Sequence, residues 1–240
     1  MRNILIFSAF SVFLLTGCFW NFDKDRMKGS GIVTKEQRAV SSFDKIEIAG
    51  AFKVHLSQGD IESVEVEIDD NLQPYVEVRN TGSKLILKFE DSIKLRNITK
   101  SNVYITMKNI DLFCVTGVCT LKMDGALNVT FLTIDVQGVF NTELELYCDQ
   151  LNADLNGVAN IELRGNTEEL KIVQKGVGKF NARNMEAAIV DVVNSGVGSV
   201  SVYATQELSM TNSGVGSITY SGDAIVKTIH SSGIGKIKKE

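Results

Sequence analysis

The chain has 240 residues, 44% of them hydrophobic, which is enough to build one large domain or two small ones with a real core. It carries 25 Lys and Arg against 29 Asp and Glu, so it lacks the surplus of basic side chains on which nucleic-acid binding depends. Twenty Gly and a single Pro favour β structure with many tight turns.

The N-terminus has the pattern of a lipoprotein signal peptide. An apolar run from Ile4 to Leu15 leads into Leu-Thr-Gly-Cys ending at Cys18, a lipobox. We therefore expect a signal peptide over residues 1–17, a lipidated Cys18 and a tether over residues 18–39. An uncleaved membrane helix is disfavoured, because the run is shorter than the ~20 residues that a span needs. Cys18 would then attach the protein to a membrane of the cell envelope, as an outer-membrane lipoprotein facing either the periplasm or the cell surface.

Residues 40–110 read as a modified N-terminal β section. From Phe43 onward, apolar and polar residues alternate, with turns near Gly59, Pro74 and Gly82. Strand parity places the acidic side chains around Glu65 on the solvent side. We expect this section to cap the regular repeats that follow over residues 111–240.

The second part of the chain repeats a Gly-Val or Gly-Ile pair seven times, at spacings of 21, 19, 19, 20, 18 and 19 residues. The glycines of these pairs are Gly117, Gly138, Gly157, Gly176, Gly196, Gly214 and Gly233. Such a regular period is the signature of a solenoid, because one unit cannot bury its apolar side chains without neighbours. The sequence predicts about seven rungs of roughly 19 residues, in each of which two short strands meet at a glycine corner. The last four corners carry a second glycine, which indicates a backbone angle that only Gly adopts cheaply.

Columns of like residues predict which side chains face inward. The Val or Ile directly after each glycine, such as Val197, reads as interior, as do the mostly apolar residues four positions before and four after it. Val197→Asp is therefore expected to destabilise the protein strongly, and Ser199→Asp hardly at all.

Two outward columns consist of hydroxyl, amide and Lys side chains. The corner ladder stands directly before the glycines and comprises Thr116, Gln137, Asn156, Lys175, Ser195, Ser213 and Ser232. The sheet ladder stands three positions after them and comprises Thr120, Asn141, Asn160, Lys179, Ser199, Ser217 and Lys236. Columns of this kind suit binding to a glycan or a protein edge.

The chain resembles a known family, the putative auto-transporter adhesin, head GIN domain. The resemblance runs from about Val40 to the C-terminus and rests on the late Gly-Val-Gly corners and on an opening motif of Phe43, Ile46, Ile48, Gly50, Phe52, Val54, Gly59, Val64 and Val66. It implies an all-β fold, a right-handed parallel β-helix, and a role in adhesion. It brings no catalytic residues.

The remaining candidate chemistry is sparse. Cys114, Cys119 and Cys148 are odd in number and lack metal-ligand spacing, so we favour buried single thiols and expect no metal or other cofactor. The two histidines, His55 and His230, lie in strand contexts without a nucleophile motif. Ser92 lies in Asp-Ser-Ile, which resembles an O-glycosylation acceptor.

The predicted function is a binding module or adhesin without catalysis. Its candidate binding residues are Lys175, Ser195, Ser213 and Ser232 in the corner ladder and Lys179, Ser199 and Ser217 in the sheet ladder. Two alternatives stay open. One is a structural envelope component, in which polar ladders only keep the solenoid soluble. The other is a polysaccharide-acting enzyme, since such chemistry is often hosted on β-helices.

Overall fold

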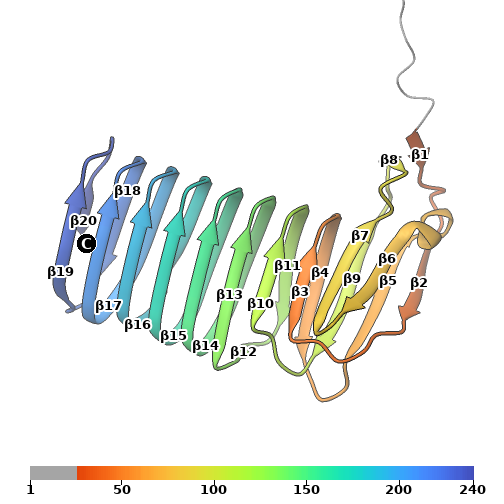
Figure 1. Cartoon of the computed structure of the whole chain (residues 1–240), viewed down its shortest axis with the longest axis horizontal. Coiled ribbons are helices and arrows are strands. Elements are labelled where there is room, and N and C mark those ends of the chain that lie inside the picture. Colours follow the sequence, from red (N-terminus) through yellow and green to blue (C-terminus); the bar gives the residue numbers. More distant parts are fainter. Residues whose placement is uncertain (1–25) are drawn as a thin grey trace, which may run out of the picture.

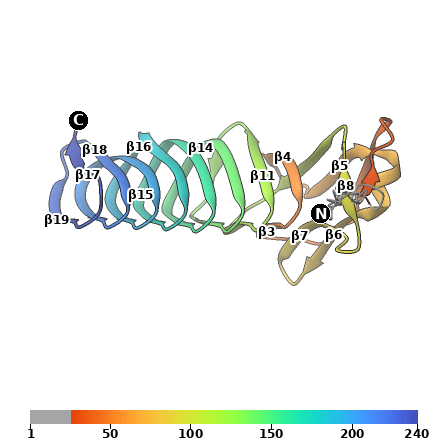
Figure 2. The same ribbon diagram turned by 90° about the horizontal axis from the view of Figure 1, so that it is seen from above.

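The computed structural model describes residues 26–240, which form a β-solenoid closed at one end by an antiparallel cap (Figure 1). Successive rungs follow one another along the long axis, and the cap lies beyond the first rung (Figure 2). The pairings between regular rungs are parallel, which confirms the predicted β-solenoid. Cys18 and the signal peptide lie outside the described residues.

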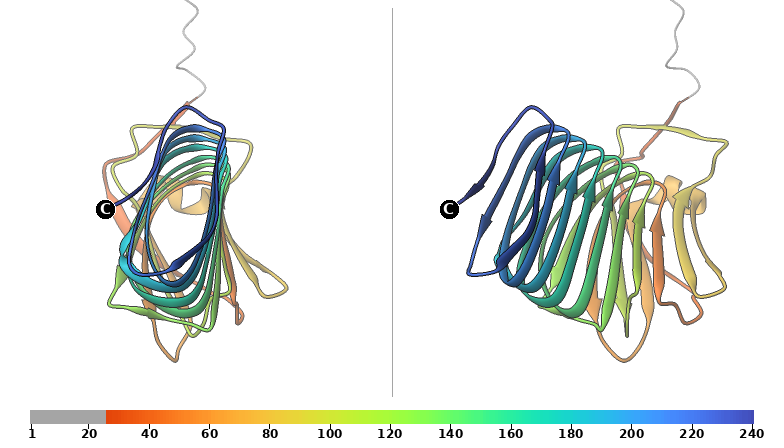
Figure 3. Two further views of the ribbon diagram at one scale, coloured as in Figure 1. Left: turned by 90° about the vertical axis from the view of Figure 1, so that its left-hand side faces the viewer. Right: turned by 60° about the vertical axis from the view of Figure 1, so that its left-hand side comes forward.

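The solenoid strands form two walls, a pre-corner wall and a post-corner wall, which meet at the glycines on what we call the corner side (Figures 1 and 3). Each of the long strands β14 to β17 contributes to both walls. The solenoid strands are β3 (Lys45–Ile48), β4 (Ala51–Gln58), β10 (Leu112–Val115), β11 (Val118–Asp124), β12 (Leu127–Asn128), β13 (Phe131–Val136), β14 (Val139–Leu155), β15 (Val158–Gln174), β16 (Val177–Asn194), β17 (Val197–Asn212), β18 (Val215–Ser221), β19 (Ile225–Ser231) and β20 (Ile237–Lys239).

Glycine at the corners allows the backbones of neighbouring rungs to approach closely. A Cβ at Gly196 would lie 2.1 Å from the carbonyl oxygen of Gly176 in the preceding rung, far inside van der Waals contact. The second glycine of the late corners is also needed for its backbone angle, as predicted, because Gly198 has φ +144°. The repeat in the sequence therefore records a steric requirement of stacking.

The interior follows the strand alternation of both walls. The columns four residues before and four residues after each glycine are buried in all but the last rung, as predicted; examples are Val192 and Val200. The second residue after the glycine also faces inward, and Phe140 at this position is fully buried. The interior is thus mainly an apolar stack along the axis, except two residues before the late glycines, where Gln174, Asn194 and Asn212 are buried.

The prediction for the residue directly after each glycine is wrong. These side chains point outward, and Val177 and Val197 are 52% and 49% exposed. The chain turns at the glycine, so the residues on both of its sides, such as Ser195 and Val197, face solvent, and inward alternation resumes one position later. We call this outward column the valine edge; it comprises Val118, Val139, Val158, Val177, Val197, Val215 and Ile234.

The cap is built from segments distant in the sequence. β5 pairs antiparallel with both β2 and β9, while β6 and β7 form an antiparallel hairpin. β7 and β9 then stack in parallel on β3 and β4, so the β3–β4 rung lies between the cap and the β10–β11 rung. The cap elements are β2 (Val33–Arg38), β5 (Ser63–Asp69), the 3-10 helix η1 (Asp70–Tyr75), β6 (Val76–Thr81), β7 (Lys84–Phe89) and β9 (Ser101–Met107).

Residues 18–39 were expected to form a tether, but paired strands already begin within this range. β2 falls within that range, and so does β1 (Arg26–Lys28), which pairs with β8 (Lys94–Arg96). The β1–β8 ribbon projects on the corner side (Figure 1). Every described strand pairs with another strand of residues 26–240, so the strand pairing of the fold is contained in this segment. Within it, no helix is long and apolar enough to cross a membrane.

Candidate binding surface

The sheet ladder runs along the outside of the post-corner wall. Lys179, Ser199 and Ser217 are register partners on β16, β17 and β18, and Asn141 and Asn160 precede them on β14 and β15. The Asn160 amide donates a hydrogen bond to Asn141 Oδ1 at 3.0 Å. Because neighbouring strands lie ~4.8 Å apart, the wall presents hydrogen-bonding groups at a constant interval.

A depression of about 590 Å³, open to solvent, lies over the first half of this ladder. Four ladder residues line it, Thr120, Asn141, Asn160 and Lys179. The charged side chains around it nearly balance, because three cationic groups face two carboxylates. These are Lys122, Arg164 and Lys179 against Glu143 and Glu162. The surface is therefore suited to hydrogen bonding more than to capture of a strongly charged ligand.

Arg164 organises one side of the depression. Its guanidinium donates to Glu143 Oε1 from Nη1 at 3.1 Å and to Glu145 Oε2 from Nε at 3.0 Å. The hydrogen bond from Arg164 holds the pKa of Glu145 below its usual range. The two ion pairs couple the positions of the three side chains.

The same wall continues into the cap with an aromatic pair. His55 on β4 stacks on Tyr104 of β9 with ring centroids 4.7 Å apart, and Lys35 Nζ lies 4.3 Å from the centre of the Tyr104 ring. Burial is the main cause that lowers the pKa of His55, and Lys53 and Lys122 lower it further. A second depression, of about 360 Å³, is lined by His55, Tyr104 and Lys122. Lys122 lines both depressions, so they adjoin.

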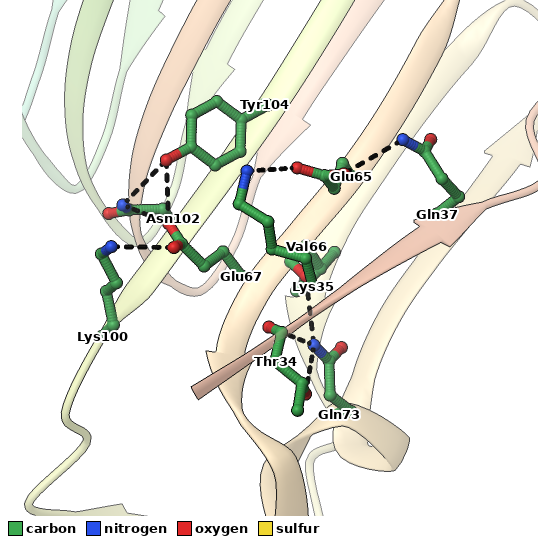
Figure 4. Close-up of polar contacts among 10 residues, drawn as sticks. All are labelled: Thr34, Lys35, Gln37, Glu65, Val66, Glu67, Gln73, Lys100, Asn102 and Tyr104. Carbon is green, nitrogen blue, oxygen red and sulfur yellow. Dashed lines mark hydrogen bonds and ion pairs between the residues drawn. The ribbon is translucent and has the colours of Figure 1, made fainter. Parts of the chain in front are cut away.

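A polar network on the outer face of the cap holds Tyr104 in place (Figure 4). The Glu67 carboxylate accepts hydrogen bonds from Lys100 Nζ at 2.8 Å, Asn102 Nδ2 at 2.9 Å and Tyr104 Oη at 2.8 Å. These contacts, that with Lys100 foremost, lower the pKa of Glu67 to about 2. Lys35 also pairs with Glu65 at 2.7 Å.

Strand parity predicted that the acidic side chains around Glu65 all lie on the solvent side, but two of them do not. Glu67 is only 8% exposed, and Asp69 is fully buried. The Asp69 carboxylate accepts hydrogen bonds from the Gly31 amide and from the amide and hydroxyl of Thr99, each at 2.8 Å. Asp69 is the last residue of β5, and its hydrogen bonds join β5 to two other segments of the cap. Its burial follows from these contacts, which strand parity does not describe.

The structure places all seven candidate ladder residues at the surface but does not merge the two ladders. Lys175, Ser195, Ser213 and Ser232 are exposed on the corner side, whereas Lys179 is exposed, and Ser199 and Ser217 are half-buried, on the post-corner wall. The valine edge separates the two ladders. Only the sheet ladder enters the depression.

The other candidate residues are dispersed. Cys114, Cys119 and Cys148 are free and buried, as favoured, and burial raises the pKa of Cys119 to about 12. Over residues 26–240, no group of three or more His, Cys, Asp and Glu side chains could hold a metal ion. Ser92 is exposed between β7 and β8, with its hydroxyl 3.5 Å from Glu90. Its glycosylation stays a prediction.

Two features of the surface escaped the sequence reasoning. The outward direction of the valine edge could have been found by counting from the buried column four residues after each glycine, because an odd separation reverses the face of a strand. The aromatic extension through His55 and Tyr104 depends on the pairing of β4 with β9, which no local pattern reveals.

The fold and the ladders define a β-solenoid that presents a repetitive polar wall. Residues 42–224 match the model of the family described as "Putative auto-transporter adhesin, head GIN domain", and the chain belongs to this family. No curated protein matches the chain.

Three solved structures are similar to the chain. A putative adhesin from Bacteroides fragilis NCTC 9343 has a TM-score of 0.85 and 27% identity, covering 89% of this chain and 100% of that chain. A putative lipid binding protein from Parabacteroides distasonis ATCC 8503 has a TM-score of 0.69 and 23% identity, covering 90% and 99%. A putative adhesin from Parabacteroides merdae ATCC 43184 has a TM-score of 0.63 and 20% identity, covering 90% and 99%. The last two similarities concern the fold alone.

Proposed function

We propose that the protein is an envelope lipoprotein, anchored through Cys18, whose solenoid binds an extended polymer along the sheet ladder. The depression of about 590 Å³ over Thr120, Asn141, Asn160 and Lys179 carries this proposal. Membership in a family described as adhesins supports a binding role.

A glycan is the ligand class that the wall suits best. Amide and ammonium groups on successive rungs can each hydrogen-bond one hydroxyl of a sugar chain, so several weak contacts add along one ligand. The His55–Tyr104 pair and Lys122 line the adjoining depression, where a further sugar unit could bind. The near balance of charge around the depression favours a neutral or weakly charged polymer.

The solenoid interior does not support a lipid site. A cavity lined by Phe113, Phe140, Leu144 and other mostly apolar side chains has a volume of only about 10 Å³. This is at the lower limit for a single water molecule, and an acyl chain does not fit. Although the similar Parabacteroides distasonis protein is named as a putative lipid binding protein, we therefore propose no lipid site in the interior of this chain.

The test uses purified segment 26–240 on a glycan array and on immobilised extracellular-matrix proteins. The triple variant Asn141→Ala, Asn160→Ala, Lys179→Ala removes three side-chain hydrogen-bonding groups. At ~0.5–1.5 kcal/mol each, we expect binding to fall roughly tenfold or more, with a smaller loss for each single change. The matched control Ser195→Ala, Ser213→Ala, Ser232→Ala alters the corner ladder and is expected to keep parental binding.

Two results would count against this proposal. If the parent segment binds nothing on either array, a structural envelope role becomes the better account. If both triple variants lose binding equally, the contact surface is not the sheet ladder. The anchor is tested separately in cells, where Cys18→Ser is expected to release the protein from membranes or to leave the precursor unprocessed.

A further inference from the structure

The valine edge is a continuous apolar strip along the corner side. Val158, Val177, Val197 and Val215 are register partners and between 40% and 52% exposed. At ~4.8 Å per rung, neighbouring aliphatic side chains touch one another along the strip. Contiguous apolar side chains exposed on a soluble protein commonly mark a contact surface.

The columns that flank the valine edge contain no acidic residue. The corner ladder and the sheet ladder together hold three lysines, Lys175, Lys179 and Lys236, and otherwise neutral polar side chains. This contrasts with a chain that has 29 Asp and Glu. The strip is therefore apolar along its centre and weakly basic beside it.

The β1–β8 ribbon adds basic charge on the same side. Arg26 lies opposite Lys94, and Lys28 lies opposite Arg96. Arg26, Lys28 and Lys94 thus bring basic charge to the corner side, where an anionic surface would attract them. Figure 1 and the view along the solenoid axis in Figure 3 both show that the described chain starts on the corner side.

The position of the ribbon relates the corner side to the lipid anchor. Arg26 is eight residues after Cys18, a distance of at most ~29 Å of extended chain. A lipid at Cys18, which is part of the proposed function, would thus hold the corner side near a bilayer.

We propose that the corner side, with the valine edge and the β1–β8 ribbon, lies on an anionic phospholipid surface. The aliphatic side chains enter the interfacial layer, and the Lys and Arg side chains contact the lipid phosphates. The post-corner wall leads away from this surface, so its depression stays accessible to a ligand. The solenoid then lies along the membrane, with its axis parallel to the bilayer.

The test measures co-sedimentation of segment 26–240, which carries no lipid, with vesicles of phosphatidylcholine and phosphatidylglycerol. The edge variant Val158→Asp, Val177→Asp, Val197→Asp is expected to reduce partitioning roughly tenfold or more, because it places carboxylates against lipid phosphates. The control Asn166→Asp, Asn184→Asp, Gln206→Glu adds the same charge at exposed positions midway between corners and is expected to bind as the parent does. All of these side chains are exposed. Because Val158, Val177 and Val197 are register partners, their three carboxylates repel one another, so the edge variant should melt below the control, and partitioning is measured well below both melting temperatures.

Three outcomes would overturn this inference. They are a parent that does not bind anionic vesicles, equal binding to vesicles of phosphatidylcholine alone, and equal losses in the edge variant and its control. Light scattering without vesicles adds a fourth, because a parental dimer that the edge variant abolishes would make the edge an interface between copies. The glycan and matrix arrays report on the other wall, so failure of the vesicle test and failure of the proposed function are distinguishable.

Discussion

The assignment of inward and outward faces is tested by two substitutions on β17, Val200→Asp and Val197→Asp. Val200 is fully buried, with Phe180 and Ile218 as its register partners on the adjoining rungs. Val197 lies three residues earlier at the corner and is 49% exposed. The same chemical change is thus made in two environments on one strand.

The expected magnitudes differ several-fold. An apolar interior disfavours the charged carboxylate, and a rise of about 3 pKa units costs ~4 kcal/mol at pH 7. Loss of the buried valine methyl groups adds about 1 kcal/mol, so Val200→Asp should cost ~5 kcal/mol. Domain stabilities are ~5–15 kcal/mol, so this variant should be close to unfolding. Val197→Asp should change the stability by less than ~1 kcal/mol, since half of the side chain is already in water.

Urea denaturation followed by far-ultraviolet circular dichroism measures both values. A raised folded-state pKa makes the penalty at position 200 shrink as the pH falls from 7 toward 4, because the folded state then binds the extra proton. Similar destabilisation by the two variants, or a larger effect at Val197, would refute the assignment of the valine edge to the surface.

Three further predictions follow from packing and charge. Gly196→Ala should destabilise the solenoid by about 3 kcal/mol, because the new methyl group displaces the Gly176 carbonyl that accepts a 2.9 Å hydrogen bond from Val197; an unchanged urea midpoint would contradict this. Because the pKa of Glu67 is lowered from 4.5 to about 2, its carboxylate should stabilise the fold at pH values above 4.5, and this stabilisation should be lost as the pH falls toward 2. Glu67→Gln should remove this pH dependence. Cys119 should react with a thiol reagent only on unfolding, and rapid labelling of the native protein would contradict its burial.

The repeats were predictable because the close approach of neighbouring rungs requires glycine at the same corner position in every rung. No other residue fits at Gly196 or Gly198, so the period is visible in the sequence itself. The interior columns followed from strand alternation wherever the backbone is extended. Alternation failed at the corners, where the chain turns between Ser195 and Val197 and both side chains face outward.

The cap could not be predicted because its contacts are distant in the sequence. β2 pairs with a strand some thirty residues later, and β9 pairs with β4 after a separation of about fifty residues. The burial of Asp69 depends on Gly31 and Thr99, which come from two other segments. The binding wall was predicted as columns of polar residues, but the depression arises only where β11, β14, β15 and β16 lie side by side.

The central claim is that the post-corner wall is open to a ligand at the cell surface while the corner side lies on the membrane. Labelling of single cysteines in the full-length chain on intact cells, with a thiol reagent that does not cross membranes, tests it directly. Asn160→Cys in the depression should be labelled on intact cells, while Val197→Cys on the valine edge should be protected until detergent is added. Labelling of Asn160→Cys only after the cells are permeabilised would remove adhesion from the account, and equal labelling of both variants would contradict the proposed orientation.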